Sequence, residues 1–249
     1  MGRRIVVMRA TTRKLWEKQD RHKGDRKRLF AAVRAAVDGN NVLYPGSFVD
    51  IAPSIAFSSV TYVDMDKRTP AFFADEDGIT EIMTSEGGSP TAEVRFIHGD
   101  YQTDLGLAPD SFDLLVSLYA GFVSDHCTDY LRVGGILLAA PSHGDVAMAS
   151  IDPRYRLVGV IESRSGDYRI KTTELDSYLV PKTEIEVTPA MLHERGRGIR
   201  YGGRVSQTRG GIRHDHRGTV GPPGHQAGRD LSRRGRRRRG HPDDSRGIR

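Results

Sequence analysis

The sequence predicts an α/β fold with a doubly wound, mostly parallel sheet. Short apolar runs alternate with segments of helical spacing from residue 25 to about residue 150. One of these runs, Phe112 to Leu118, is apolar at nearly every position, which is typical of a strand covered on both faces. Alternation of this kind in a chain of 249 residues favours one sizeable domain.

The first elements follow in order. Apolar residues at helical spacing predict a helix over 25–37, which DGNN ends, and a strand over 41–44. The segment IAPSIAFSS is long enough for one or two helical turns. A second strand covers 59–66 and ends in acidic residues, and a helix over 72–82 is broken by EGGSP.

The pattern then repeats. A third strand covers 93–100 and a fourth covers 112–118. VSDHCTDYLRVGG predicts a short helix closed by Gly134 and Gly135, and GILLAAPS predicts a fifth strand. Together these elements predict a Rossmann-like sheet covered on both faces.

After Ser150 the alternation of apolar strands with helices ends. YRLVGVIESRSGDYRIKTTEL predicts a C-terminal hairpin, with its turn at 164–167. TPAMLHERGRG predicts a last short helix, with Thr188 as N-cap before Pro189.

We predict a domain over 1–201 and a disordered basic tail over 202–249. The tail is Arg/Gly-rich with almost no apolar residues, so it cannot bury a core. Its basic residues are all arginine, and its abrupt onset also fits a reading frame shifted near codons 195 to 210. On that hypothesis the last strand would be missing and one sheet edge would be unpaired.

The charge distribution and the cysteine content limit the kinds of protein and of metal site that this sequence can form. The net charge is +6, but residues 193–249 hold 16 Arg and 5 acids, so the rest of the chain is mildly acidic. The single cysteine excludes an internal disulfide and a cysteine-based zinc site. The histidines of RHDHRG lack a second ligand pair, so we expect no metal. With no apolar run long enough for a membrane span, the sequence predicts a cytoplasmic protein.

The strand ends carry the candidate ligand site, because open parallel sheets bind ligands at the carboxyl ends of their strands. Gly46, in VLYPGSFVD, allows close backbone approach after the first strand. Asp64 after the second strand can accept from ribose hydroxyls, and Asp100 after the third can accept from an adenine amino group. The set predicts an adenosine site. The alternatives are a tight turn at Gly46 and strand-ending or helix-capping roles for Asp64, Asp66 and Asp100.

These segments resemble the class I S-adenosylmethionine-dependent methyltransferases over about residues 29–138. VLYPGS stands in the place of the glycine-rich first motif, VTYVDMD in that of the acidic second and FIHGDYQT in that of the third. SFDLLVSLYAG and YLRVGGILLAA stand in the places of the later motifs. The resemblance implies that S-adenosylmethionine binds with its methionine part over Gly46 and Ser47, its ribose at Asp64 and its adenine at Asp100.

The first motif departs from the family pattern. Tyr44 and Pro45 precede Gly46, while Phe48 and Asp50 replace later glycines. Phe48 is expected to crowd a cofactor along the loop and to divert the loop's path. Asp50 is expected to meet the cofactor's methionine ammonium group.

Two residues are candidates for the chemistry. His143, in PSHGD, is a candidate general base, with a helix-capping loop histidine as the alternative. Tyr119, after the fourth strand, is a candidate acceptor contact, or else covers the sheet end. His126 and Cys127 are neighbours in a short helix, where adjacent side chains point apart, so we expect a surface helix with a buried cysteine.

The favoured function is S-adenosylmethionine-dependent methyl transfer to an unidentified acceptor. The sequence after the fourth strand has no NPPY pattern that would point to an amino group of a base or of glutamine. A catalytically inactive, methyltransferase-like binding module is the alternative. The third hypothesis is non-specific nucleic-acid binding through RRGRRRRG, although no aromatic residue follows Tyr201 for base stacking.

Overall fold

A computed structural model describes residues 8–164 and 166–202, together with the backbone of 208–214. The described residues all fall in one compact unit. A second unit, 218–249, lies outside the described residues, so the predicted disorder of the tail stays a prediction there.

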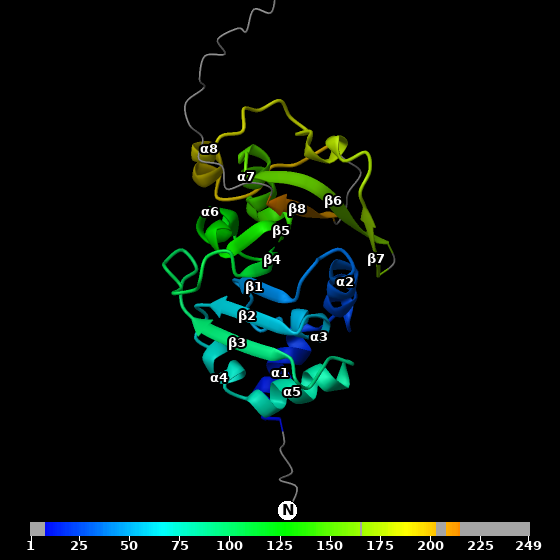
Figure 1. Cartoon of the computed structure of the whole chain (residues 1–249), viewed down its shortest axis with the longest axis vertical. Helices are drawn as coiled ribbons and strands as arrows, with labels where there is room; N and C mark the ends of the chain where they lie inside the picture. The colour runs from blue at the N-terminus through cyan, green and yellow to red at the C-terminus, as the bar shows by residue number, and fades with distance from the viewer. Residues whose placement is uncertain (1–7, 165, 203–207, 215–249) are drawn as a thin grey trace, which may run out of the picture. The chain divides into compact units, whose positions relative to one another are not determined.

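The unit is built on one sheet of eight strands in the order β3-β2-β1-β4-β5-β8-β6-β7 (Figure 1). The first five strands in that order are parallel, which confirms the doubly wound, Rossmann-like prediction. They are β3 (Glu93–His98), β2 (Ser59–Asp64), β1 (Asn41–Pro45), β4 (Phe112–Ser117) and β5 (Leu131–Ala139).

Helices cover both faces because side chains alternate along each strand. On β1, Val42 and Tyr44 enter a core with the helices α2 and α5, while Leu43 enters a core with α6 and α7. The first face carries α1 (Ala10–Gln19), α2 (Asp25–Arg34), α3 (Pro53–Ala56), α4 (Thr69–Phe73) and α5 (Glu76–Ser85). The second carries α6 (Val123–Cys127), the 3₁₀ turn η1 (Thr128–Tyr130) and α7 (Asp145–Ile151).

The predicted hairpin and last helix are confirmed. The strands β6 (Tyr155–Arg164) and β7 (Asp167–Lys171) pair antiparallel, and η3 (Asp176–Leu179) follows. In α8 (Pro189–Arg195), the Thr188 hydroxyl accepts the N–H of Met191 at 3.2 Å. Thr188 is therefore an N-cap, as its position before Pro189 predicts.

The strand β8 (Thr208–His214) lies antiparallel between β5 and β6, inside the segment predicted to be a tail. The strand occupies the place in the sheet that the frameshift hypothesis leaves empty, while the predicted disorder of 202–249 stays a prediction. A strand held on both sides needs only backbone groups to complete two hydrogen-bond ladders, so TRGGIRH can fill this slot with few apolar residues.

Three other local predictions need correction. Residues 10–19 form α1, where no element was expected, and the helix expected over 72–82 is divided into α4 and α5 at Asp75. Gly134 and Gly135 do not close a helix, because β5 already begins at Leu131. Instead the pairing register of β4 and β5 shifts there, and Gly134 has a φ of 81°. Glycine at a bulge and glycine after a helix give the same sequence signal.

Candidate functional site

The loop after β1 turns at Gly46, whose φ of 64° lies in the left-handed region. A Cβ atom there would come within 2.4 Å of the Ala120 Cβ, in the loop after β4. The Gly46 N–H donates to the carbonyl of Val63 at 2.8 Å. Glycine is therefore required both by the turn and by the close approach of two loops at the carboxyl edge of the sheet.

Phe48 stands where a second glycine is usual, and its φ of 49° is one that glycine adopts freely. An L residue in this conformation costs about 1–2 kcal/mol. Two contacts accompany the strain. The Phe48 N–H donates to Asp64 Oδ2 at 2.7 Å, and the Arg68 guanidinium lies 4.6 Å from the centre of the Phe48 ring. The half-buried Phe48 packs against the core cluster. The neighbouring Ser47 is fully buried.

Asp50, at the place of a third glycine, is fully buried in an ion pair with Arg26 of α2. Arg26 Nε and Nη2 donate to Asp50 Oδ2 at 2.8 and 2.6 Å. The Tyr44 hydroxyl donates to the same oxygen at 3.1 Å. The structure thus places Asp50 against a guanidinium of this chain, in the role that the sequence analysis gave to a cofactor ammonium group.

The ion pair changes the titration of its members. Burial acts to lower the pKa of Arg26, but the charge and hydrogen bonds of Asp50 together with Tyr44 and Tyr119 outweigh it and raise that pKa. Burial and the Asp50 charge together raise the pKa of Tyr44 well above its ordinary value. Arg26 therefore stays charged and Tyr44 stays neutral at all ordinary pH values.

One nitrogen of the Arg26 guanidinium takes no part in these hydrogen bonds. Nη1 is a buried nitrogen without a hydrogen-bond partner among the described residues. The guanidinium carbon lies 5.2 Å from the ring centre of Tyr119, which is 51% exposed. A charged donor with no acceptor thus lies beneath an open aromatic residue, close to the loop that Gly46 begins. A buried unpaired donor is costly, and an anionic ligand would relieve the cost.

Arg26 was not among the residues predicted from the sequence. The signal is present in α2, because Arg26 shares the helical spacing of the buried Leu29, Phe30 and Val33. An arginine on the apolar stripe of a helix requires a buried partner, and Asp50 is that partner.

At the end of β2, Asp64 joins two segments. Its Oδ2 accepts the N–H of Phe48 and its Oδ1 accepts the N–H of Asp66, each at 2.7 Å. Each carboxylate oxygen can still accept a second donor. Asp66 differs, since it pairs with Arg68 at 2.6 Å. Hydrogen bonds from Arg68 lower the pKa of Asp66 to about 2. Of these two carboxylates, Asp64 has the capacity for a ligand.

The end of β3 adjoins Asp64. His98 is the register partner of Asp64, and the Gly99 N–H donates to the Asp64 carbonyl at 3.2 Å. Asp100 follows and accepts the N–H of Gln102 through Oδ1 at 3.0 Å, which leaves its other oxygen for a ligand. Between the two strand ends, Met65 is 67% exposed, a large apolar side chain that the sequence analysis also missed.

The loops after β4 and β5 meet next to these residues. His143 ends the short helix η2 (Pro141–His143), and its carbonyl lies 2.8 Å from the position that a Cβ on Gly121 would take. His143 is half-buried. Tyr119 and Gly121 belong to the same loop, so the two predicted chemistry residues come from loops in contact.

A buried carboxylate fixes the loop that bears Tyr119. Asp145, at the start of α7, accepts the Ser117 hydroxyl at 2.6 Å. It also accepts the N–H groups of Val123 and Ser124 at 3.1 and 2.7 Å. Burial raises the pKa of Asp145, while these donors oppose the shift. Asp145 therefore clamps the two ends of the Tyr119 loop.

The remaining expectations concern α6 and metals. Cys127 is fully buried and His126 is exposed, as expected for a surface helix with a buried cysteine. Burial raises the pKa of the Cys127 thiol to about 12, so it is not a nucleophile. Within the described residues, no group of three or more His, Cys, Asp or Glu side chains suits a metal ion. Among the same residues, no helix is long and apolar enough to cross a bilayer.

Comparison with known proteins gives structural likenesses only. No protein-family model and no curated protein matches the chain. Solved methyltransferase structures do match. One is a proposed S-adenosylmethionine-dependent methyltransferase of Methanococcus maripaludis, 12% identical, with 56% of this chain and 65% of that chain covered and a TM-score of 0.39.

Two further matches have similar identity. The N-methyltransferase NodS of Bradyrhizobium japonicum, solved with S-adenosylhomocysteine, is 14% identical over 67% of this chain and 100% of that chain, with a TM-score of 0.39. A complex from Haloferax volcanii joins the Trm112 methyltransferase activator to a proposed methyltransferase. That match is 14% identical over 84% of this chain and 100% of that chain, with a TM-score of 0.42. At these identities and TM-scores the likeness carries no conclusion about activity.

Proposed function

We propose that the chain binds S-adenosylmethionine at the carboxyl edge of its sheet and transfers the methyl group to an acceptor. The observation that carries this proposal is the buried Nη1 of Arg26, which lies beside the Gly46 loop and has no hydrogen-bond partner among the described residues. A guanidinium matches a carboxylate in charge and in shape, and the cofactor's methionine part ends in one. In this proposal Asp50 holds Arg26 in place and does not contact the ligand.

The other strand ends supply the rest of the site. Asp64 accepts from the ribose hydroxyls with its free lone pairs, and Asp100 accepts from the adenine amino group. Met65 covers one face of the adenine. Gly46 and Ser47 hold the methionine part through their backbone. The unit that carries these residues has a single cysteine, buried and unpaired, which agrees with a reducing cytoplasm.

When bound, S-adenosylmethionine supplies an electrophilic methyl group on a positively charged sulfur. That methyl group would pass to a lone pair of the acceptor, and the electron pair of the carbon–sulfur bond would leave with the sulfur. The protein's contribution is to align the two partners and to exclude water. His143 takes the proton that the acceptor loses, and Tyr119 positions the acceptor.

A second candidate is a module that binds the same ligand without catalysis. Phe48 favours it, because a phenylalanine occupies a loop position that glycine usually holds and its ring lies under Arg68. Cofactor binding without turnover over a broad panel of acceptors would support this candidate against the first.

Calorimetric titration of S-adenosylmethionine into the full chain tests the site. Asp64→Asn should weaken binding at least tenfold, because the amide replaces one of the two acceptor oxygens by an NH2 group that cannot accept from a ribose hydroxyl. Asp66→Asn, two residues away, is the matched control and should bind as the parent chain does. Arg26→Lys should also weaken binding, and a circular dichroism melt shows that each variant is folded. Equal affinity in all four proteins would contradict the assignment.

The proposed tail activity needs a separate test. Deleting residues 202–249 would also remove β8, so loss of nucleic-acid binding in that variant would be ambiguous. Replacing the six arginines of RRGRRRRG by glutamine leaves the sheet intact and tests the tail alone.

A further inference from the structure

Positive charge is concentrated at the start of the described chain. Residues 8–28 hold nine Lys or Arg and three acids, whereas residues 29–202 hold fourteen Lys or Arg and twenty-five acids. An acidic body thus carries one basic segment, which comprises α1, the turn after it and the first residues of α2. Such separation of charge on a surface attracts an oppositely charged partner.

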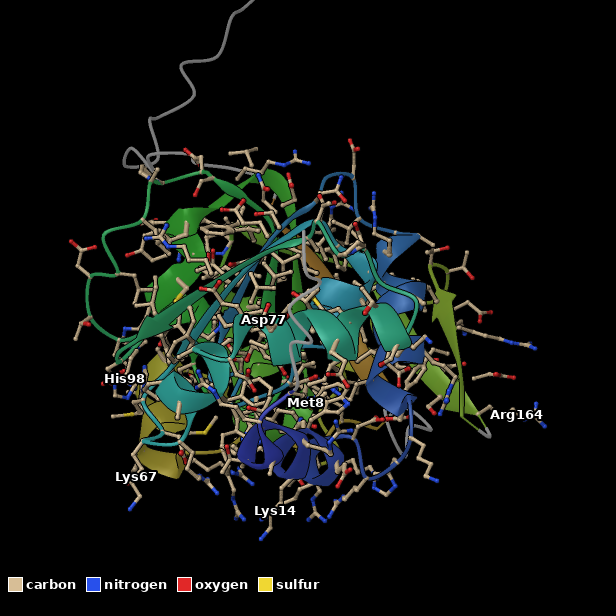
Figure 2. All side chains as sticks on the ribbon, turned by 90° about the horizontal axis from the view of Figure 1, so that it is seen from below. Met8, Lys14, Lys67, Asp77, His98 and Arg164 are labelled. Carbon is tan, nitrogen blue, oxygen red and sulfur yellow. The ribbon has the colours of Figure 1, made fainter. Side chains whose placement is uncertain are left out.

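Four cations of this segment are exposed and form no ion pair within the described part of the chain. We call them the basic patch: Lys14, Lys18, Arg21 and Lys23. Lys14 and Lys18 are four residues apart in α1 and so share one face of the helix. Lys14 extends from α1 away from the sheet (Figure 2). The segment's exposed acid is Glu17, so the patch keeps an excess of positive charge.

Neighbouring cations on the same elements are not free. Arg13 pairs with Glu81 at 3.4 Å and Lys27 pairs with Glu86 at 3.3 Å. These partners lie on or just after α5, which packs against α1. The cations that face α5 are therefore neutralised, and those that face solvent remain available to a partner.

The basic patch adjoins a residue of the candidate site along the chain. Lys23 precedes Arg26 by three residues, and Arg26 contacts both Asp50 and Tyr119. The carboxylate of Asp20, inside the turn, accepts the N–H of Gly24 at 2.8 Å.

The surface chemistry favours one class of polyanion. Among the residues that the structure describes, the large apolar side chains that are exposed are Met65, Tyr119, Val133, Val180 and Ile185. None lies in α1 or the following turn, so the patch offers no apolar anchor for a bilayer. Tyr119, by contrast, is an exposed ring beside Arg26, and an unpaired base stacks on such a ring.

We infer that the basic patch binds the phosphates of a single-stranded polynucleotide, whose unpaired base stacks on Tyr119 and is the methyl acceptor. This inference rests on the proposed function, because Tyr119 is placed there at the acceptor side of the cofactor. It names the class of acceptor that the sequence left open. Recognition through phosphates predicts little dependence on base sequence.

The test is fluorescence anisotropy of an end-labelled, mixed-sequence single-stranded RNA of 20 nucleotides, about the length that several contacts require. The full chain is compared with the variant Lys14→Gln/Lys18→Gln/Arg21→Gln/Lys23→Gln. The matched control, Arg169→Gln/Lys182→Gln/Arg195→Gln/Arg197→Gln, removes four exposed cations from other elements. All three proteins carry the same tail, so its contribution cancels.

We expect the patch variant to bind at least tenfold more weakly than the control variant. The slope of log K against log salt should fall by about 0.7 for each phosphate that the variant no longer neutralises. Equal affinity and equal slope in the two variants would overturn the inference, as would a patch that binds polyglutamate but not RNA. Transfer of labelled methyl to the RNA, abolished in Tyr119→Ala but retained in Tyr119→Phe, would support the stacking role.

The cofactor titration separates this inference from the proposed function. If S-adenosylmethionine binds the patch variant normally while RNA binding does not depend on the patch, the inference fails and the proposed function stands. If RNA binding depends on the patch but the cofactor does not bind, the proposed function fails and only the phosphate-binding surface is supported.

Discussion

The buried ion pair between Arg26 and Asp50 gives the sharpest stability prediction, because a second arginine–aspartate ion pair with the same donor distances lies at the surface of the protein. In both pairs the arginine donates through Nε at 2.8 Å and through Nη2 at 2.6 Å. The side chains of Arg26 and Asp50 are 7% and 0% exposed, against 49% and 31% for Arg68 and Asp66. Burial is therefore the main variable.

Arg26→Met leaves the Asp50 carboxylate buried without its countercharge. Removing one partner of a buried pair costs about 3–5 kcal/mol. For a chain of this size each kcal/mol lowers the melting temperature by about 2–4 °C, so we expect a decrease of about 6–20 °C. Arg68→Met should leave the melting temperature unchanged within error, because an exposed pair is screened by solvent.

The assay is thermal unfolding of the full chain, followed by circular dichroism. The double variant Arg26→Met/Asp50→Leu should be more stable than either single variant, because it removes both charges and leaves none unpaired. If Arg26→Met melted within about 3 °C of Arg68→Met, less than the scale above allows, the buried pair would not have the role argued here.

The remaining predictions concern a thiol, a glycine and a buried carboxylate. The pKa of the Cys127 thiol is raised from 9.0 to about 12, so the contribution of this thiol to stability is present below pH 9 and is lost as the pH rises toward 12. Iodoacetamide at pH 8 should label Cys127 only after unfolding, and rapid labelling of the native protein would contradict this. Gly87→Ala should cost only the backbone strain of about 1–2 kcal/mol, because Gly87 has a φ of 86° and an added Cβ would have nothing within 4 Å. Gly46→Ala should destabilise the fold by more than this, since its Cβ would also collide with Ala120. Equal midpoints for the two variants in urea titrations would refute the close approach. Asp145→Asn turns one acceptor oxygen into a donor that faces N–H groups, so we expect a loss of stability of about 1–3 kcal/mol for each broken hydrogen bond. Amide hydrogen exchange at residues 117–124 should become faster, and unchanged exchange would contradict the role of Asp145 as a clamp.

The sheet was predictable because its strands are apolar where both faces are covered. The five parallel strands and the hairpin appear within a few residues of their predicted positions, since burial on both faces leaves a direct mark on composition. The candidate positions Gly46, Asp64 and Asp100 fall at neighbouring strand ends for the same reason. Their ligand contacts stay predictions.

The partners of charged side chains were not predictable. Asp50 was assigned to a ligand because a sequence does not say which cation meets a buried carboxylate, and Arg26 lies 24 residues away. The two glycines at 134 and 135 were placed after a helix because a bulge produces the same pair of residues. Local composition gives the type of turn but not the element that the turn interrupts.

The order of the strands has a consequence for how the protein is made. The strand β8, residues 208–214, inserts between segments that the ribosome completes some 50 or more residues earlier, and chains emerge N-terminus first. Until it arrives, β5 and β6 each expose a row of unpaired backbone groups, which invite pairing with another chain. The last stretch of translation therefore decides whether the sheet closes on itself or on a neighbour. A nascent chain arrested at residue 200 should bind a holdase chaperone that the finished chain does not bind.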